Sequence, residues 1–304
     1  MDAVVIDHLV KRFPTALAVD DVSFSITKGE IFGFLGPNGA GKTTTLHCIC
    51  QLAVPSSGDI VVEGYHTDKD YILARKQIGL SPQEFNFEHN YTVYESLLYA
   101  AGFFGVPSSK AKIRADQLLR EFGLYEKRFE QFSRLSGGMK RKASIIKALM
   151  HDPKILILDE PTAGIDVEAR FELWEFIKRL NKKGMTIILT THYIEEAEQL
   201  CDRIGIISKG KILLLEEKKK LMEDLSRNVI RIHFDKQISL PSVFSSYECE
   251  YKGKELSIFV SAKEQHDVLS RVLELFRKKG ITLRQFNVEQ DTLEHIFRRI
   301  VYGK

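Results

Sequence analysis

Apolar residues follow two different patterns along this chain. Val22, Phe24 and Ile26 alternate with polar neighbours, which is typical of a strand with one buried face in an antiparallel sheet. Residues 155–158 and 185–190 are instead predominantly apolar runs, which favour strands buried on both faces of a parallel sheet. These patterns predict an α/β fold with a mixed sheet core and an antiparallel subdomain beside it.

Helical spacing of apolar residues separates the predicted strands. A stripe after residue 166 predicts that Phe171, Trp174, Ile177 and Leu180 face the core. The other helices and strands of this part are predicted over residues 43–52, 111–122 and 139–150, and over 4–6, 19–26, 31–35, 58–62 (as an edge strand), 78–81, 203–208 and 211–215.

The apolar pattern restarts beyond residue 225, so we predict two domains, 1–225 and 226–304. Strands at 229–234, 256–260 and 281–286, a further one within 247–251, and helices at 268–276 and 293–302 make the second a small α+β domain. We expect this accessory domain to regulate the first or to support its dimerisation.

A glycine-rich loop lies between the strand at 31–35 and the helix that follows. Residues 36–43 fit the pattern G-x-x-x-x-G-K-[ST] of a phosphate-binding loop. Its glycines let backbone N–H groups converge on phosphate oxygens, and the helix N-terminus adds more. Lys42 would reach the β- and γ-phosphates, and the Thr43 hydroxyl would ligate Mg²⁺. The alternative is a glycine-rich turn that matches by chance.

Polar residues end two of the buried strands. Asp159 and Glu160 follow the first, where ligands bind in open α/β sheets. Asp159 suits Mg²⁺, and Glu160 suits a general base on the water that attacks the γ-phosphate. His192 ends the next strand and could reach the same phosphate, although a lone histidine is more often structural.

Three further positions admit both a binding and a structural interpretation. Phe13 could stack on a nucleotide base or be a core or edge aromatic. Gln83 could touch Mg²⁺ or the attacking water, or could simply be solvated. Ser136, Gly137 and Gly138 precede the helix at 139–150, so they could form a second anion site or a serine cap with a flexible turn.

Aromatic residues are unusually dense over residues 84–87 and 97–104. They could be the core of a helical subdomain or an exposed surface for a partner protein, and we expect both to be partly true. The four cysteines, Cys48, Cys50, Cys201 and Cys249, lack metal-site spacing, and the first two are expected to be small core residues.

Composition narrows the function further. The 304 residues carry a net charge of +3 with both signs mixed, which is too weak to predict a nucleic-acid partner. The sequence shows neither a membrane-span pattern nor a signal-peptide pattern, so we expect a cytoplasmic protein whose membrane role comes through another chain.

The order of these motifs closely resembles the ATPase subunit of ABC transporters over about residues 1–225. The resemblance implies the P-loop NTPase cassette fold, with a helical subdomain, and the cofactors ATP and Mg²⁺. It identifies Phe13 as the adenine-stacking aromatic, Gln83 as the Q-loop glutamine, and Asp166 as the D-loop aspartate. It also implies metal contacts from Thr43, Gln83 and Asp159, and catalytic roles for Lys42, Gln83, Glu160 and His192. The implied nucleotide-binding residues are Phe13, Gly36, Pro37, Asn38, Gly39, Ala40, Gly41, Lys42, Thr43, Thr44, Ser136, Gly137, Gly138 and Asp166.

The resemblance also implies partners. ATP on the loop of one subunit would be closed over by Ser136–Gly138 of a second, in a homodimer or heterodimer, and transmembrane permease subunits would hold the pair at the inner face of the cell membrane. Met139 stands where the family commonly has glutamine, and this variant and the tail at residues 291–297 are similar to the drug- and polysaccharide-exporting branch.

Three rival functions remain at this stage. A soluble ABC ATPase acting on ribosomes or DNA usually has two cassettes or a long coiled coil, and neither is present in the sequence. A nucleotide-binding scaffold would not need Glu160 and His192. An importer subunit is the third, but residues 226–304 do not resemble the β-rich regulatory domain of many importers.

Overall fold

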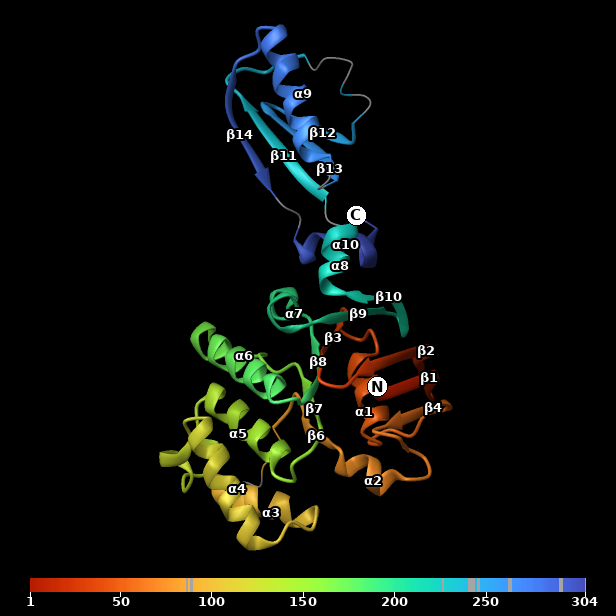
Figure 1. Cartoon of the computed structure of the whole chain (residues 1–304), viewed down its shortest axis with the longest axis vertical. Coiled ribbons are helices and arrows are strands. Elements are labelled where there is room, and N and C mark those ends of the chain that lie inside the picture. Colours follow the sequence, from red (N-terminus) through yellow and green to blue (C-terminus); the bar gives the residue numbers. More distant parts are fainter. Residues whose placement is uncertain are drawn as a thin grey trace. The chain divides into compact units, whose positions relative to one another are not determined.

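The chain forms two compact units, residues 1–217 and 218–304. The computed structural model describes residues 1–85, 87, 90–225, 227–239, 244, 247–261, 264–289 and 292–303. Asn86 of the aromatic stretch, Ser226 at the predicted domain boundary and Asp291 of the tail lie outside the described residues. Figure 1 labels the elements.

An antiparallel sheet with the strand order β2-β1-β4-β5 opens the first unit. Its strands are β1 (Asp2–Phe13), β2 (Ala16–Thr27), β4 (Ser57–Val62) and β5 (Tyr65–His66). Val22, Phe24 and Ile26 of β2 are all buried, as the alternation predicted. The prediction that residues 58–62 form an edge strand was wrong, because β4 pairs with β1 on one side and with the short β5 on the other.

A six-stranded sheet, in the order β10-β9-β3-β8-β7-β6, is the core of this unit. The strands from β9 to β6 run parallel, and β10 pairs antiparallel with β9. Every residue of β3, β7 and β8 is buried, which accounts for the largely apolar sequences of these strands. The bounds are β3 (Ile31–Leu35), β6 (Ile78–Ser81), β7 (Ile155–Asp159), β8 (Thr186–Thr191), β9 (Arg203–Ser208) and β10 (Lys211–Glu217).

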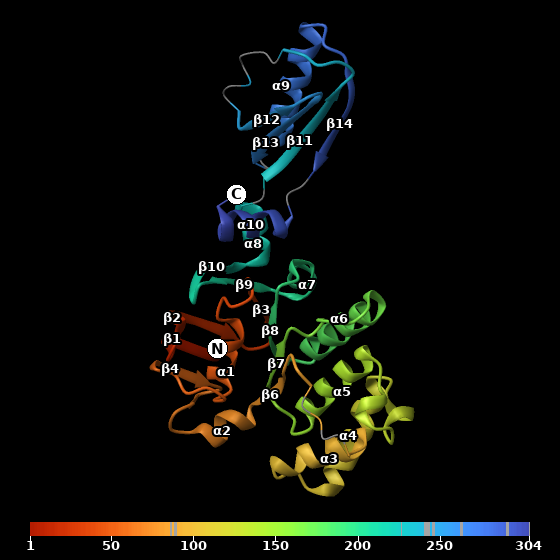
Figure 2. The same ribbon diagram turned by 180° about the vertical axis from the view of Figure 1, so that it is seen from behind.

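Helices α3 to α6 gather on the side of the six-stranded sheet away from β1, β2 and β4, as both views show (Figure 2). The helices of this unit are α1 (Lys42–Ile49), α2 (Tyr71–Lys76), α3 (Val93–Phe103), α4 (Ser108–Glu121), α5 (Gly137–Leu149), α6 (Val167–Lys182) and α7 (Ile194–Leu200), with short 3₁₀ turns η1 (Tyr125–Lys127) and η2 (Phe132–Arg134). Trp174, Ile177 and Leu180 of α6 are buried as predicted, but Phe171 is 52% exposed, so its assignment to the core was wrong.

The second unit is a small α+β fold with its own core. Its antiparallel sheet has the order β12-β13-β11-β14. Phe276 of α9 packs against Phe234 of β11 with ring centroids 5.3 Å apart, so the helix covers one face of the sheet. The bounds are α8 (Lys218–Leu225), β11 (Arg227–Phe234), β12 (Cys249–Lys252), β13 (Glu255–Ser261), α9 (Gln265–Lys278), β14 (Leu283–Glu289) and α10 (Leu293–Tyr302).

Two further expectations concern membranes and cysteines. In the part of the chain that the structure describes, every helix is too short or too polar to cross a membrane. Cys48 and Cys50 are buried, and burial raises the pKa of the Cys48 thiol to about 11 and that of Cys50 to about 12. Their burial confirms that these two cysteines are small core residues.

Candidate active site

The loop at residues 36–41 joins β3 to α1, as the motif requires. Gly41 adopts a φ of 108°, and a Cβ there would lie 2.5 Å from the carbonyl oxygen of Ala18. Only glycine fits this position. The first turn of α1 lacks both a side-chain cap and an acidic residue, so its backbone N–H groups remain suited to an anion.

Lys42 is buried at the start of α1 with its ammonium group over the loop. Nζ donates to the carbonyl oxygens of Gly36, at 2.7 Å, and Pro37, at 3.1 Å. Burial lowers the pKa of Lys42, and the negative charges of Glu160 and Asp159 oppose that shift. The neighbouring carboxylates therefore favour a charged Lys42 at the point where phosphate oxygens would bind.

Thr43 and Asp159 meet beside the loop. The Thr43 hydroxyl donates to the Asp159 carboxylate at 3.1 Å from Oδ2 and 3.2 Å from Oδ1. Asp159 ends β7 opposite Thr190 of β8, whose hydroxyl also donates to Oδ1. Hydroxyl and carboxylate oxygens are the donors that Mg²⁺ prefers, so this pair fits a magnesium site.

Glu160 follows Asp159 with two side-chain contacts. Its φ is 47°, a left-handed conformation that is uncommon outside glycine. Oε2 accepts a hydrogen bond from Nε2 of Gln83 at 3.1 Å, and Oε1 lies 3.2 Å from Nδ1 of His192. Gln83 and His192 thus hold the carboxylate from two different strand ends.

The structure brings six of the predicted residues into one connected group: Lys42, Thr43, Gln83, Asp159, Glu160 and His192. Phe13 lies apart from these contacts, at the end of β1. It is 41% exposed, and Nζ of Lys11 lies 4.9 Å from the centroid of its ring. The exposure excludes the core interpretation of Phe13, and β1 pairs with strands on both sides, so it is not an edge strand.

Ser136, Gly137 and Gly138 begin α5 rather than precede it, because the helix starts at Gly137 and not at Met139. Ser136 is the N-cap and accepts a hydrogen bond from the Met139 N–H at 3.3 Å, which confirms the serine cap, whereas Gly137 and Gly138 lie in the first turn of the helix and not in a flexible turn. A Cβ on Gly137 would lie 3.5 Å from the Gly164 carbonyl oxygen. In its own chain, this segment therefore contacts the turn before α6.

Asp166 caps that neighbouring helix. Its Oδ1 accepts a hydrogen bond from the Ala169 N–H at 2.8 Å. The side chain is exposed, as is that of Ser136. Both caps satisfy helix N–H groups and leave their polar groups at the surface.

Sequence reasoning missed two residues of the site, Thr190 and Arg141. Thr190 could have been found from its place two residues before His192, because adjacent parallel strands align Asp159 with Thr190. Arg141 had no such signal, since its partners are backbone carbonyl groups of residues 82 and 83.

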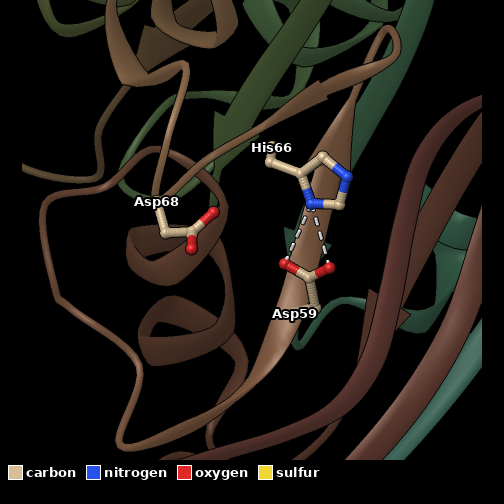
Figure 3. Close-up of side chains that lie close together, drawn as sticks. All are labelled: Asp59, His66 and Asp68. Carbon is tan, nitrogen blue, oxygen red and sulfur yellow. Dashed lines mark hydrogen bonds and ion pairs between the residues drawn. The ribbon is translucent and has the colours of Figure 1, made fainter.

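Asp59, His66 and Asp68 form a second group of possible metal ligands, in the antiparallel sheet region (Figure 3). Their donor atoms lie within 4.8 Å of one another. Nδ1 of His66 faces Asp59 and lies 3.0 Å from its Oδ2, and the two side chains are 41% and 50% exposed. Asp68 is also exposed, so we interpret the group as surface side chains with one ion pair of small energetic value rather than as a metal site.

A phosphate loop beside two carboxylates at the carboxyl end of one parallel strand, β7, defines the chain as a P-loop NTPase. Residues 19–163 match the family model described as "ABC transporter". The chain is 37% identical to the linearmycin resistance ATP-binding protein LnrL of Bacillus subtilis, over 96% of each chain. It is also 37% identical to the Nod factor export ATP-binding protein I of Rhizobium etli, over 99% of this chain and 93% of that protein.

Solved structures match the first part of the chain. One is cbiO1 of Clostridium perfringens, described as part of the ABC transporter complex cbiONQ, at a TM-score of 0.67, 28% identity, and coverage of 73% of this chain and 91% of that one. Another is the ATP-binding cassette MJ0796 bound to ADP and Pi, described as dimeric, at a TM-score of 0.65, 26% identity, and coverage of 70% and 98%.

The chain therefore belongs to the ABC transporter family as an ATP-binding subunit, and its activity is ATP hydrolysis. The family, the cassette fold and the ATPase activity predicted from the motifs are confirmed. Subunits of this family generally dimerise and work with transmembrane permease components.

Proposed function

We propose that this chain powers export through a separate transmembrane permease, at the inner face of the cell membrane. The observation that carries the catalytic part is the placement of Glu160 between Gln83 and His192, next to the Thr43–Asp159 pair. The names of the export and resistance relatives favour export over import or a ribosomal or DNA-bound role.

In the proposed reaction, Glu160 accepts a proton from the water that attacks the γ-phosphate. Gln83 and His192 orient the Glu160 carboxylate. Lys42 and His192 stabilise charge on the transferring phosphoryl group. Thr43 and Asp159, with Gln83, would hold Mg²⁺, which when bound would neutralise phosphate charge. Residues 36–44 would hold the phosphates through the loop and the start of α1.

The second half of the site would come from another subunit, identical or related. The exposed Ser136 cap and the first turn of α5 would close over ATP held on the partner's phosphate loop, with Asp166 at the same interface. Phe13 would stack on the adenine, for which its exposed ring at the end of β1 is suited. The cassette MJ0796 is described as dimeric, which supports a working unit of two subunits.

The permease would dock in an apolar groove of about 860 Å³ in the first unit. Phe103, Ile72 and Tyr99 line it and are 75%, 55% and 53% exposed. Arg75 and Lys76 also line it, so we propose that the occupant is a permease segment with both apolar and acidic side chains. Residues 97–104 are thus split between the core, through Leu97 and Ala101, and this surface.

Replacing Phe103 with aspartate is expected to weaken permease association by more than about tenfold, because it puts a charge into the apolar centre of the proposed interface. The measurement is the yield and identity, by mass spectrometry, of membrane protein that co-purifies with the tagged chain. Phe129→Asp is the matched control, since Phe129 is 64% exposed and does not line the groove.

Equal yields from the two variants would reject the docking surface. An import permease or a ribosome among the co-purified partners would reject the proposed export function instead.

Removing the residues after 226 is expected to change dimerisation, ATP turnover or transport, because we propose a regulatory or dimer-supporting role for the second unit. That unit has its own apolar core, around Ile230, Leu256 and Phe276. Light scattering, phosphate release and transport of the truncated chain test this. Unchanged values for all three would reject the role.

A further inference from the structure

Arg141 of α5 is one of the largest fully buried side chains, at 2% exposure. Nη1 donates to the carbonyl oxygen of Pro82 at 2.7 Å, and Nη2 donates to that of Gln83 at 3.1 Å. Its Cζ lies 4.9 Å from the centroid of the Phe85 ring. Nε finds no acceptor among the described residues. The guanidinium therefore bridges two backbone carbonyl groups of the segment that follows β6.

Because Arg141 is buried, its positive charge is stabilised by hydrogen bonds to the segment after β6. A buried cation is costly unless its hydrogen bonds are made, and the acceptors of Arg141 among the described residues are the carbonyl oxygens of Pro82 and Gln83. The negative charges of Asp159, Glu196 and Glu160 act on it from further away and oppose the lowering of its pKa by burial. Displacing Pro82 and Gln83 would leave the guanidinium without its acceptors.

The segment that Arg141 binds, Pro82–Gln83, contacts the Glu160 carboxylate directly. Gln83 accepts from Arg141 through its backbone and donates from its side chain to Glu160 at 3.1 Å. Arg141 also lies one helical turn beyond Gly137, the first residue of α5. A continuous set of contacts thus runs from the start of α5 through Arg141 and Gln83 to Glu160.

We propose that Arg141 is a positioning residue that holds Gln83 against Glu160 and transmits a shift at the start of α5 to the catalytic carboxylate. This rests on the proposed roles of Gln83 and Glu160. Arg141 acts through Gln83 rather than by touching nucleotide, so it sets the rate of the chemical step and not the affinity for ATP.

The test compares ATP turnover in full-length Arg141→Met, Arg141→Lys and a control. Methionine fills similar space without the charge, and lysine keeps the charge but cannot bridge two carbonyl groups in a fixed fork. We expect Arg141→Met to lower kcat by about tenfold to a hundredfold, with KM for ATP within about twofold, because small misplacements of catalytic groups cost that much. Lys142→Met, which removes the adjacent charge of α5 and its pair with Glu172, should keep wild-type kcat.

A double-mutant cycle with Gln83→Ala separates positioning from general stability. We expect Arg141→Met to lower kcat by less than about twofold in the Gln83→Ala background, because the group through which it acts is gone. If Arg141→Met does not fold, Arg141→Lys enters the same cycle. Wild-type kcat, a raised KM with unchanged kcat, or full additivity with Gln83→Ala would overturn the proposal.

Glu160→Gln, measured alongside, tells the two failures apart. If Glu160→Gln is inactive and Arg141→Met is normal, the positioning role alone fails. If Glu160→Gln turns over ATP normally, the proposed catalytic assignment fails, and the positioning role fails with it.

Discussion

Glu160→Gln should lower ATP turnover by about a hundredfold to ten-thousandfold, the usual contribution of a positioned general base. The amide keeps the size of the side chain and an oxygen that can accept from Gln83 Nε2. It cannot take a proton from water at neutral pH. Phosphate release measures the loss, and calorimetry should show that ATP still binds.

The control for this variant is Glu175→Gln, which makes the same chemical change on the exposed face of α6, where Glu175 pairs with Lys178. It should retain wild-type turnover. Near-normal phosphate release by Glu160→Gln would show that Glu160 is not the catalytic base.

Lys42→Ala should lose measurable nucleotide binding. The ammonium is buried over the loop, 2.7 Å from the Gly36 carbonyl oxygen, and would make charge-assisted hydrogen bonds to the β- and γ-phosphates. Hydrogen bonds to charged groups contribute about 1.5–3 kcal/mol each, so losing two corresponds to a decrease in affinity of roughly two to four orders of magnitude. Titration calorimetry with ATP measures this directly.

Lys178→Ala removes a charge from the surface of α6 and should bind ATP as the wild type does. Thermal unfolding of both variants checks that the fold is intact, because Lys42 is a buried side chain. Tight ATP binding by folded Lys42→Ala would contradict the assignment of the loop lysine.

Local sequence predicted the parts of the fold that local physics determines. The mostly apolar runs before Asp159 and His192 form fully buried strands, because a strand covered on both faces favours apolar residues at successive positions. The pattern at residues 58–62 did not reveal its neighbours, since β4 lies between β1 and β5 through pairing of distant segments. Phe171 has helical spacing with Trp174, yet it is exposed at the protein surface, where its ring packs edge-on against the Trp174 ring.

Some residues of the candidate site could also be predicted from local sequence, and others could not. Lys42, Thr43, Asp159, Glu160 and His192 belong to recognisable strand ends and loops, so their convergence could be predicted. Arg141 could not, because its function rests on the backbone of a loop more than fifty residues earlier in the chain. Thr190 contributes through strand register, which a single sequence encodes only indirectly.

The central claim is that the phosphate loop is half of a site that a second subunit completes. It can be tested by light scattering with ATP, comparing Glu160→Gln with Glu160→Gln/Gly137→Asp. A Cβ at Gly137 meets only ordinary contacts in its own chain, so the added aspartate should leave the subunit folded and repel ATP held by a partner.

We predict the mass of two chains for Glu160→Gln and of one chain for the double variant, with calorimetry showing that ATP still binds to both. A single-chain mass for ATP-bound Glu160→Gln, or equal dimerisation of the two variants, would contradict the account.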